Sequence, residues 1–296
     1  MLKTSLVLIA LLLSPVAAAQ AQTQSDWALP FGGAAPDRSQ PLTDVMPDAQ
    51  PGGPLVPALM SPEIPGPLVP IQALTPSRPI VVELFTSEGC ASCPPANAYL
   101  AELARRPQLL ALSFHVDYWD YIGWKDRFAD PANAERQRAY AKAKGKAIVY
   151  TPQIVIAGAI PVIGSDRRAV EGGLEAAQDR KAMAEPSLAR DAAGTVHLRL
   201  PATPLSVPAA LWFVTYSRQG ASDVTAGENE GRRMESINIV RSLRRLGQWD
   251  GGILSQTIDL TPDEIAAAPD ACAIIANEAE FGPVVAAAAW NIKDLR

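Results

Sequence analysis

Cys90 and Cys93 are the residues whose type and spacing most clearly permit chemistry. Two thiols three positions apart can close a disulfide, exchange electrons with another thiol pair, or hold one soft metal ion. They follow an apolar, β-branched run over residues 80–85, which predicts a buried strand, and they precede two consecutive prolines. Because prolines fit the first positions of a helix, the pair is expected where a strand ends and a helix begins, with Ser92 or Cys93 as the N-cap.

The reactivity of this pair depends on the pKa values of its thiols, because the thiolate and not the thiol attacks disulfides. A helix N-terminus stabilises a thiolate and favours Cys93, whereas the Glu88 carboxylate works in the opposite direction. Two alternatives to a redox role stay open. The pair is a permanent disulfide at the start of the helix, or Cys90, Cys93 and His115 bind a soft ion such as copper(I).

Three further residues are candidates for proton transfer near the cysteines. His115 and Asp117 lie at the end of a second apolar run over residues 109–116, at the sheet edge expected to carry the cysteines. A histidine there can act as a base, a proton relay or a metal ligand. Glu83 lies within the first predicted strand, where burial would raise its pKa and let it shuttle protons. The alternating side-chain directions of a strand equally allow an ion pair with a cation such as Lys125.

The loop after the second strand is rich in aromatic residues. These side chains can form the floor of a groove for an extended peptide or an apolar substrate. They can also form a hydrophobic cluster that covers the loop, and we favour this second interpretation. The residues are Tyr118, Trp119, Tyr121 and Trp124.

Hydrophobic periodicity and turn residues predict an α/β region over residues 79–185 and an all-β sandwich-like domain over residues 186–296. The first region is expected to alternate strand, helix, strand, helix, strand, strand, helix, over residues 80–85, 94–105, 109–116, 131–145, 153–156, 160–163 and 166–181. Strands of the second are expected over residues 195–200, 210–216, 237–246, 253–260, 271–277 and 284–290. Within it, Cys272 is predicted to be a buried free thiol and His197 a structural residue.

The run Gly89-Cys90-Ala91-Ser92-Cys93 after the first strand, together with Thr151-Pro152 before the third, resembles the thioredoxin-like superfamily. The resemblance implies that the peptide bond before Pro152 is cis and faces the cysteines. It further implies that Thr151 and Pro152 position a substrate chain, with Cys90 as nucleophile and Cys93 as resolving thiol. The chain departs from that pattern in three ways. Ala-Ser separates the cysteines, and the interval from Cys93 to Pro152 is longer than in a minimal thioredoxin. Glu83 is also one residue further from Cys90 than the buried carboxylate of thioredoxins.

Two longer stretches, residues 82–95 and 113–126, are similar to one specific group, the exported bacterial domain-of-unknown-function family 1223. The likeness covers about residues 78–290. It brings no established activity with it, so the family name says little about a substrate.

The N-terminal residues 1–21 have the pattern of a secretory signal peptide. Lys3 precedes an apolar run over residues 6–13, which is too short to span a bilayer comfortably, and small residues follow at 19–21. No membrane span is therefore expected after cleavage. Residues 22–78 are rich in proline, which favours a disordered tether over an arm packed on the folded body. Export would place the cysteines in an oxidising compartment.

Composition limits the classes of partner. Apolar residues make up 48% of the chain, ample for buried cores, and a formal net charge of −5 gives no reason to expect nucleic acid. We expect an exported thiol–disulfide oxidoreductase that acts on a protein thiol or disulfide and has only its own Cys90–Cys93 disulfide as redox group. The alternatives are a copper(I)-binding module and a redox-silent interaction scaffold. The redox expectation requires both sulfurs to meet the peptide bond before residue 152 at a water-accessible edge of the sheet.

Overall fold

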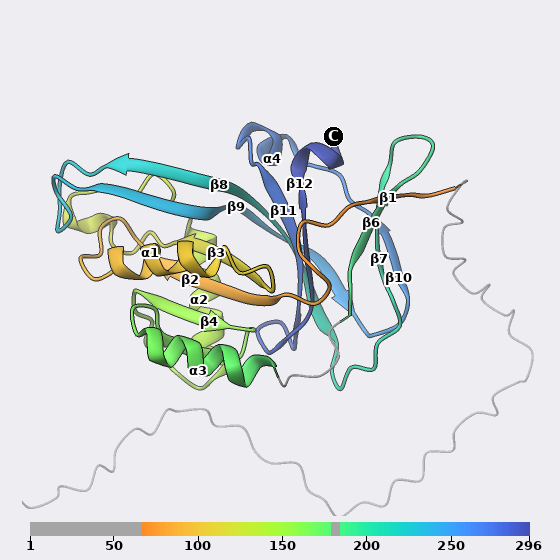
Figure 1. The fold of residues 1–296 in the computed structure, drawn as a ribbon, viewed down its shortest axis with the longest axis horizontal. Coiled ribbons are helices and arrows are strands. Elements are labelled where there is room, and N and C mark those ends of the chain that lie inside the picture. Colours follow the sequence, from red (N-terminus) through yellow and green to blue (C-terminus); the bar gives the residue numbers. More distant parts are fainter. Residues whose placement is uncertain (1–66, 179–183) are drawn as a thin grey trace, which may run out of the picture. The chain divides into compact units, whose positions relative to one another are not determined.

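The apolar run that leads to the cysteines forms a buried strand, β2 (Ile80–Thr86), in the computed structural model, which describes residues 67–178 and 184–296. β2 lies in an eight-stranded mixed sheet with the order β12-β11-β8-β9-β3-β2-β4-β5 (Figure 1). It pairs in parallel with β3 and antiparallel with β4. The other strands are β3 (Leu109–His115), β4 (Gln153–Ile156), β5 (Ile160–Ile163), β8 (Ala209–Asp223), β9 (Arg233–Trp249), β11 (Ala271–Glu278) and β12 (Val284–Asn291).

A second, four-stranded sheet has the order β1-β6-β7-β10. Its strands are β1 (Val69–Ile71), β6 (Ser187–Arg190), β7 (Val196–Leu200) and β10 (Leu254–Thr257). Leu188 and Leu198 of this sheet pack with Phe213, Ile274 and other residues of the large sheet in one buried cluster. Side chains of the two sheets therefore share one buried cluster in the C-terminal region.

Helices cover both faces of the strands that carry the cysteines. α1 (Pro94–Leu103) and α3 (Arg167–Gln178) pack on the face formed by residues such as Val82 and Leu84. α2 (Pro131–Ala143) packs on the opposite face, formed by residues such as Val81 and Phe85. Because β2 side chains alternate between these two covered faces, the strand is apolar except for Glu83 and Thr86. α4 (Pro262–Ala266) and two 3-10 turns, η1 (Asp120–Ile122) and η2 (Ile292–Leu295), complete the elements. No helix within residues 67–178 or 184–296 is long and apolar enough to cross a membrane.

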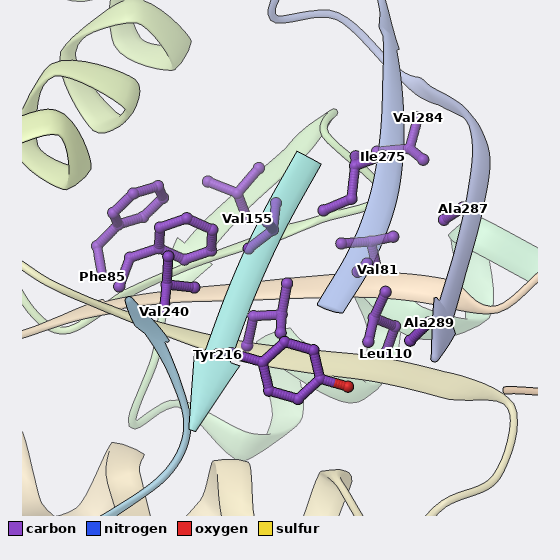
Figure 2. Packing of buried hydrophobic residues seen from close by; sticks show 14 of the residues in the cluster. Val81, Phe85, Leu110, Val155, Tyr216, Val240, Ile275, Val284, Ala287 and Ala289 are labelled. Atoms are coloured by element: carbon purple, nitrogen blue, oxygen red, sulfur yellow. The ribbon is translucent and has the colours of Figure 1, made fainter. Parts of the chain in front are cut away.

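The largest core cluster joins strands that are distant in sequence (Figure 2). Val81 and Phe85 of β2 and Val155 of β4 meet Ile275 of β11 and Val284 in the same cluster. Burial of this apolar surface is the main force that holds the N- and C-terminal strands together.

The expected boundary near residue 185 does not separate two sheets, and this part of the prediction needs correction. β9 pairs with β3 at Ser113 and Ile239, and the Ser113 hydroxyl donates to the Ile237 carbonyl at 2.8 Å. The reason is length. β8 and β9 have 15 and 17 residues, well beyond the predicted 210–216 and 237–246, so their hairpin extends alongside β3. The result is a mixed α/β architecture with one sheet shared by both regions.

The predicted tether also ends earlier than expected. Residues 69–71 form β1, which pairs antiparallel with β6, so an unstructured tether up to residue 78 is wrong for this segment. Its Pro70 is tolerated because β1 is an edge strand of the small sheet. The predicted signal peptide and residues 22–66 of the tether lie outside the described residues.

Candidate functional site

Cys90 and Cys93 form a disulfide between the end of β2 and the start of α1. The loop that carries them turns tightly, because the Cys90 amide donates to the Ser87 carbonyl and the Cys93 amide to the Cys90 carbonyl. Cys93 is the N-cap of α1, one of the two predicted positions, and the two prolines occupy the first helical positions. This arrangement places Cys93 nearer than Cys90 to the positive end of the helix dipole.

The Thr151–Pro152 peptide bond is cis, as the resemblance implies. The neighbouring Gln153 pairs with Phe85, so Pro152 lies beside the end of β2. A Cβ atom built on Gly164 would lie 3.2 Å from Cβ of Pro152 and 3.3 Å from Cβ of Ala96 in the first turn of α1. The cis-proline and the start of α1 therefore lie on either side of Gly164.

Trp119 connects Thr151 with the cysteine loop. Its indole nitrogen donates to the Thr151 hydroxyl at 2.7 Å. A Cβ atom built on Gly89 would lie 3.2 Å from Cβ of Trp119, so the tryptophan also packs on the residue next to Cys90. Thr151, Pro152 and the disulfide thus gather at one end of the sheet.

The sulfurs are not at a water-accessible edge, and that expectation is wrong for this structure. Cys90 is 1% exposed and Cys93 is 0% exposed. The turn between β8 and β9, residues 224–232, which we call the cover segment, is hydrogen-bonded to the loop that carries the two cysteines. The long β8–β9 hairpin brings this turn over the cysteine loop, and no local feature around residues 90–93 could have indicated it.

Asn229 attaches the cover segment to the cysteine loop. Its side-chain amide donates to the Glu88 carbonyl at 2.8 Å and to the Cys90 carbonyl at 2.9 Å. The neighbouring Glu228 carboxylate accepts from the Ala91 amide at 3.2 Å. The Asn229 side chain is buried, and its carbonyl oxygen has no hydrogen-bond partner. Three hydrogen bonds therefore join the cover segment to the cysteine loop.

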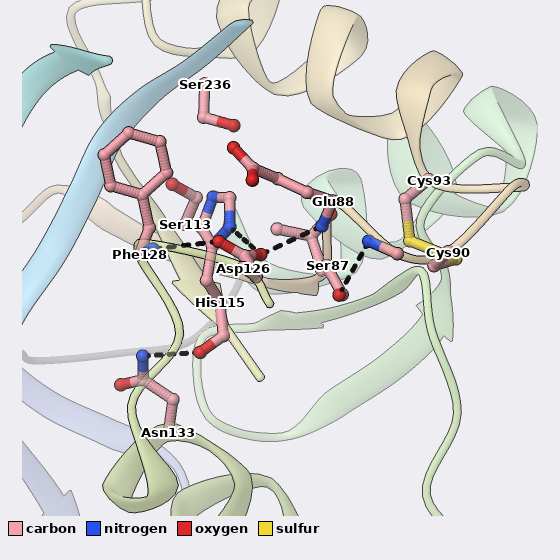
Figure 3. A network of polar contacts seen from close by, with 12 residues as sticks. Ser87, Glu88, Cys90, Cys93, Ser113, His115, Asp126, Phe128, Asn133 and Ser236 are labelled. Atoms are coloured by element: carbon pink, nitrogen blue, oxygen red, sulfur yellow. Dashed lines mark hydrogen bonds and ion pairs between the residues drawn. A yellow bond between two sulfur atoms is a disulfide. The ribbon is translucent and has the colours of Figure 1, made fainter. Parts of the chain in front are cut away.

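A buried acid–base network lies beneath the same loop (Figure 3). The His115 ring Nδ1 pairs with the Asp126 carboxylate at 2.7 Å, and both side chains are completely buried. The backbone amide of Glu88 donates to the same Asp126 oxygen at 2.9 Å. Figure 3 shows the Glu88 carboxylate directed toward His115 and away from the cysteines. One Glu88 oxygen accepts from the Trp124 indole at 2.9 Å, and the other has no partner, like Nε2 of His115.

The environment shifts the pKa values of the two carboxylates of this network, Glu88 and Asp126, in opposite directions. Burial raises the pKa of Glu88 above its ordinary value of 4.5, and the Asp126 charge adds to this increase. Burial alone would raise the pKa of Asp126 as well, but the adjacent His115 ring and amide donors hold it below its usual range. Glu88 is thus the group of this network that binds a proton more tightly in the folded state.

We expect Glu88→Gln to flatten the pH dependence of stability. A raised folded-state pKa means that the folded chain holds a proton the unfolded chain has lost, so stability from Glu88 is present below about pH 4.5 and falls as pH rises through the folded pKa. Urea unfolding at several pH values should show a smaller fall in unfolding free energy above pH 4.5 for the variant. The exposed Glu230→Gln serves as the matched control. An unchanged slope in Glu88→Gln would contradict this assignment.

A model of the family described as "Protein of unknown function (DUF1223)" matches residues 81–277, a range that includes the cysteines, the acid–base network and the cover segment. The chain belongs to the DUF1223 family. A solved structure of a protein from Agrobacterium tumefaciens, AGR_C_4864, is 30% identical to this DUF1223 chain. The alignment covers 73% of this chain and 96% of that one, with a TM-score of 0.61.

A second solved structure similar to this DUF1223 chain is HBP35 of Porphyromonas gingivalis. It is 14% identical, the alignment covers 73% of this chain and 75% of that one, and the TM-score is 0.50. At this identity the likeness concerns the fold alone. No curated protein matches the chain.

Glu83 does not lie with the cysteines in this DUF1223 structure. It faces α2, where its carboxylate forms a fully buried ion pair with Arg136 at 2.7 Å and accepts from the Tyr140 hydroxyl at 2.5 Å. The proton-shuttle role predicted for Glu83 is therefore not supported by its position, and its charged partner is Arg136 instead of Lys125. The cause is strand alternation, because Glu83 and α1 are on opposite faces of β2.

The structure places His115 near the cysteine loop, as predicted, but pairs it with a carboxylate that was not singled out from the sequence. His115 is the register partner of Thr86 at the end of β2, the sheet edge where it was expected, and its carboxylate partner is Asp126. Asp126 ends the second family stretch and could have been singled out there, whereas nothing local pointed to Asn229. Among residues 67–178 and 184–296, no group of three or more His, Cys, Asp or Glu side chains is placed to hold a metal ion.

The aromatic residues divide between the two interpretations. Tyr118 and Trp119 pack against the main core, and the Tyr118 hydroxyl donates to Gln137. Tyr121 is exposed and stacks on Trp119. The cluster is therefore mainly structural. Cys272 is a buried free thiol, as predicted. The His197 ring is hydrogen-bonded to the Asp191 carboxylate.

Proposed function

We propose that the Cys90–Cys93 disulfide is redox-active and that this chain is an exported thiol–disulfide oxidoreductase whose site is closed by the cover segment. The observation that carries the proposal is the placement of a Cys-Ala-Ser-Cys disulfide at a helix start, at the same sheet end as a cis-proline. We also propose that residues 79–185 form a thioredoxin-like unit within the larger sheet. The strands β3, β2, β4 and β5 with α1, α2 and α3 support this.

The cover segment reconciles a redox role with buried sulfurs. Its polar contacts to the cysteine loop, above all the two bonds from Asn229, can open while the apolar cores stay packed. Opening would expose Cys90 and Cys93 to a thiol or disulfide group of a partner protein. Thr151 and Pro152 would then border the exposed site.

The chemistry requires no group beyond the two sulfurs. A substrate thiolate attacks one sulfur, the Cys90–Cys93 bond breaks, and the other cysteine leaves as a thiolate that takes up a proton. A second substrate thiol then loses its proton and attacks the mixed disulfide. The substrate leaves as a disulfide, and the protein has gained two electrons and two protons. The reverse sequence reduces a substrate disulfide.

The burial of both sulfurs favours an alternative to the redox function, namely a permanent structural disulfide that fixes the start of α1. A redox titration of the mature chain against glutathione mixtures decides between the two. A couple with a midpoint between about −120 and −270 mV, the range of known oxidoreductases, supports the proposal. A disulfide that stays oxidised below about −300 mV identifies a permanent link and overturns it.

Thiol counting provides the readout for this titration. Burial raises the pKa of the Cys272 thiol to about 12, so it should not react with an alkylating reagent in the folded chain. The oxidised folded chain should therefore show no reactive thiol and the reduced chain only those of Cys90 and Cys93. Cys90→Ser removes the couple and serves as the control. Retention of copper(I) by the reduced chain against a chelator would instead support the metal-binding alternative.

Export is a separate proposal that rests on residues 1–21. Fractionation of cells that express the full chain, with the mass of the mature N-terminus, tests it. Recovery of the intact chain from the cytosol would contradict it.

A further inference from the structure

An apolar cavity of about 500 Å³ lies between the end of α2, the segment 145–150 and strands β4 and β5. Its volume falls within the range of small-molecule binding pockets, roughly 300–1,000 Å³. Tyr140 and Val155, which belong to the main core, line it, and Ala147, Ile148 and Tyr150 line it from the segment. It is distinct from the disulfide site, although Tyr150 and Gln153, which flank Thr151 and Pro152, also line it.

The segment that borders the cavity exposes apolar groups to an unusual degree. Ile148 is 80% exposed and Tyr150 is 39% exposed. All residues from 142 to 148 are exposed, although they stand directly beside a core strand. The segment is anchored at both ends. The Lys146 amide donates to the Ala141 carbonyl, and the Gln137 side chain donates to the Tyr150 carbonyl at 2.8 Å. These two hydrogen bonds fix both ends of the segment that borders the cavity.

The charges at this opening have one sign. Lys144 and Lys146 line the cavity, and none of the described residues that line it is acidic. The hydroxyl of the lining residue Tyr140 donates to the buried Glu83 carboxylate, and Arg136 neutralises the charge of this carboxylate. An anionic group at the opening would thus meet the Lys146 ammonium group and no carboxylate from the described residues of the lining.

We propose that this cavity binds an amphiphile with a single hydrocarbon chain and an anionic headgroup. The chain fills the space against Val155 and Tyr140, and the headgroup, a carboxylate or a phosphate, lies at Lys146. Binding would cover Ile148 and Tyr150 and so remove exposed apolar surface from water. The proposal is independent of the redox chemistry, because neither cysteine takes part.

Calorimetric titration of the mature chain with dodecanoate, dodecyl phosphate and dodecanol, each below its micelle concentration, tests the ligand class. Both anions should bind, and dodecanol should bind about two- to fivefold more weakly, the effect of one exposed charge pair. Preference for one anion identifies the headgroup. Equal binding of all three ligands, or no binding of any, overturns the proposal.

Two variants test the location. Ala147→Trp adds an indole at the cavity from an exposed position, so folding should be retained and dodecanoate affinity should fall at least tenfold. Lys146→Glu should weaken dodecanoate but not dodecanol, whereas Lys142→Glu, which does not line the cavity, is the matched control. Unchanged affinity in Ala147→Trp, or equal losses in the two lysine variants, would place binding elsewhere and refute the assignment.

Discussion

Replacing Arg136 by alanine should lower the free energy of unfolding by about 3–5 kcal/mol, the usual effect of removing one member of a buried ion pair. The guanidinium and the Glu83 carboxylate are both completely buried, 2.7 Å apart. Without Arg136, the Glu83 charge would be left in a low-dielectric core with only the Tyr140 hydroxyl as a hydrogen-bond donor. Guanidinium chloride unfolding followed by circular dichroism measures the change.

A matched control and a double variant show whether the cause is the unpaired charge. Arg167→Ala breaks the exposed pair with Glu102 and should leave the unfolding midpoint nearly unchanged, because water screens that pair. Glu83→Leu combined with Arg136→Met removes both charges and should be less destabilised than Arg136→Ala. If the double variant loses more stability than the single one, packing and not the unpaired charge explains the effect.

Replacing Asn229 by alanine should increase the rate at which dithiothreitol reduces the Cys90–Cys93 disulfide by about 5- to 150-fold. The side chain donates two hydrogen bonds, to the carbonyls of Glu88 and Cys90, and losing them should cost the closed cover about 1–3 kcal/mol. When opening is fast relative to reduction, the rate follows the open fraction, so this free energy converts directly into rate.

Cys272 distinguishes local opening from global unfolding in the same experiment. Its thiol is buried in a different core cluster and becomes reactive only when that cluster opens. In Asn229→Ala the disulfide should be reduced faster while alkylation of Cys272 stays slow. The exposed Glu230→Gln, in the same turn, should leave both rates unchanged. An unaltered reduction rate in Asn229→Ala would show that the cover is not held by these bonds.

The local features of the site follow from short-range rules. The prolines after Cys93 fix the start of α1, and the apolar run of residues 80–85 is confirmed as β2. Asp130 caps α2, since its carboxylate accepts from the Ala132 amide. Each of these depends on residues within one turn or one strand, where backbone sterics and hydrogen bonding decide the conformation.

Long-range contacts were predicted poorly. Glu83 has several possible partners in sequence, and only the packing of α2 on β2 selects Arg136. The pairing of His115 with Asp126 depends on how the loop 117–130 folds back over the strand end. A side chain's partner across such distances is determined by the packing of whole elements, which sequence periodicity does not specify.

The sequence by itself determined that the two cysteines lie between a strand and a helix. It also determined that a later strand begins directly after Pro152. Only the tertiary structure decided whether the cysteine sulfurs meet water. The cysteine loop is hydrogen-bonded to the turn of the β8–β9 hairpin, whose Asn229 is 139 positions from Cys90. Solvent exposure is a property of all elements that pack around an atom, so it follows from the assembled fold and not from the residues next to it in the chain.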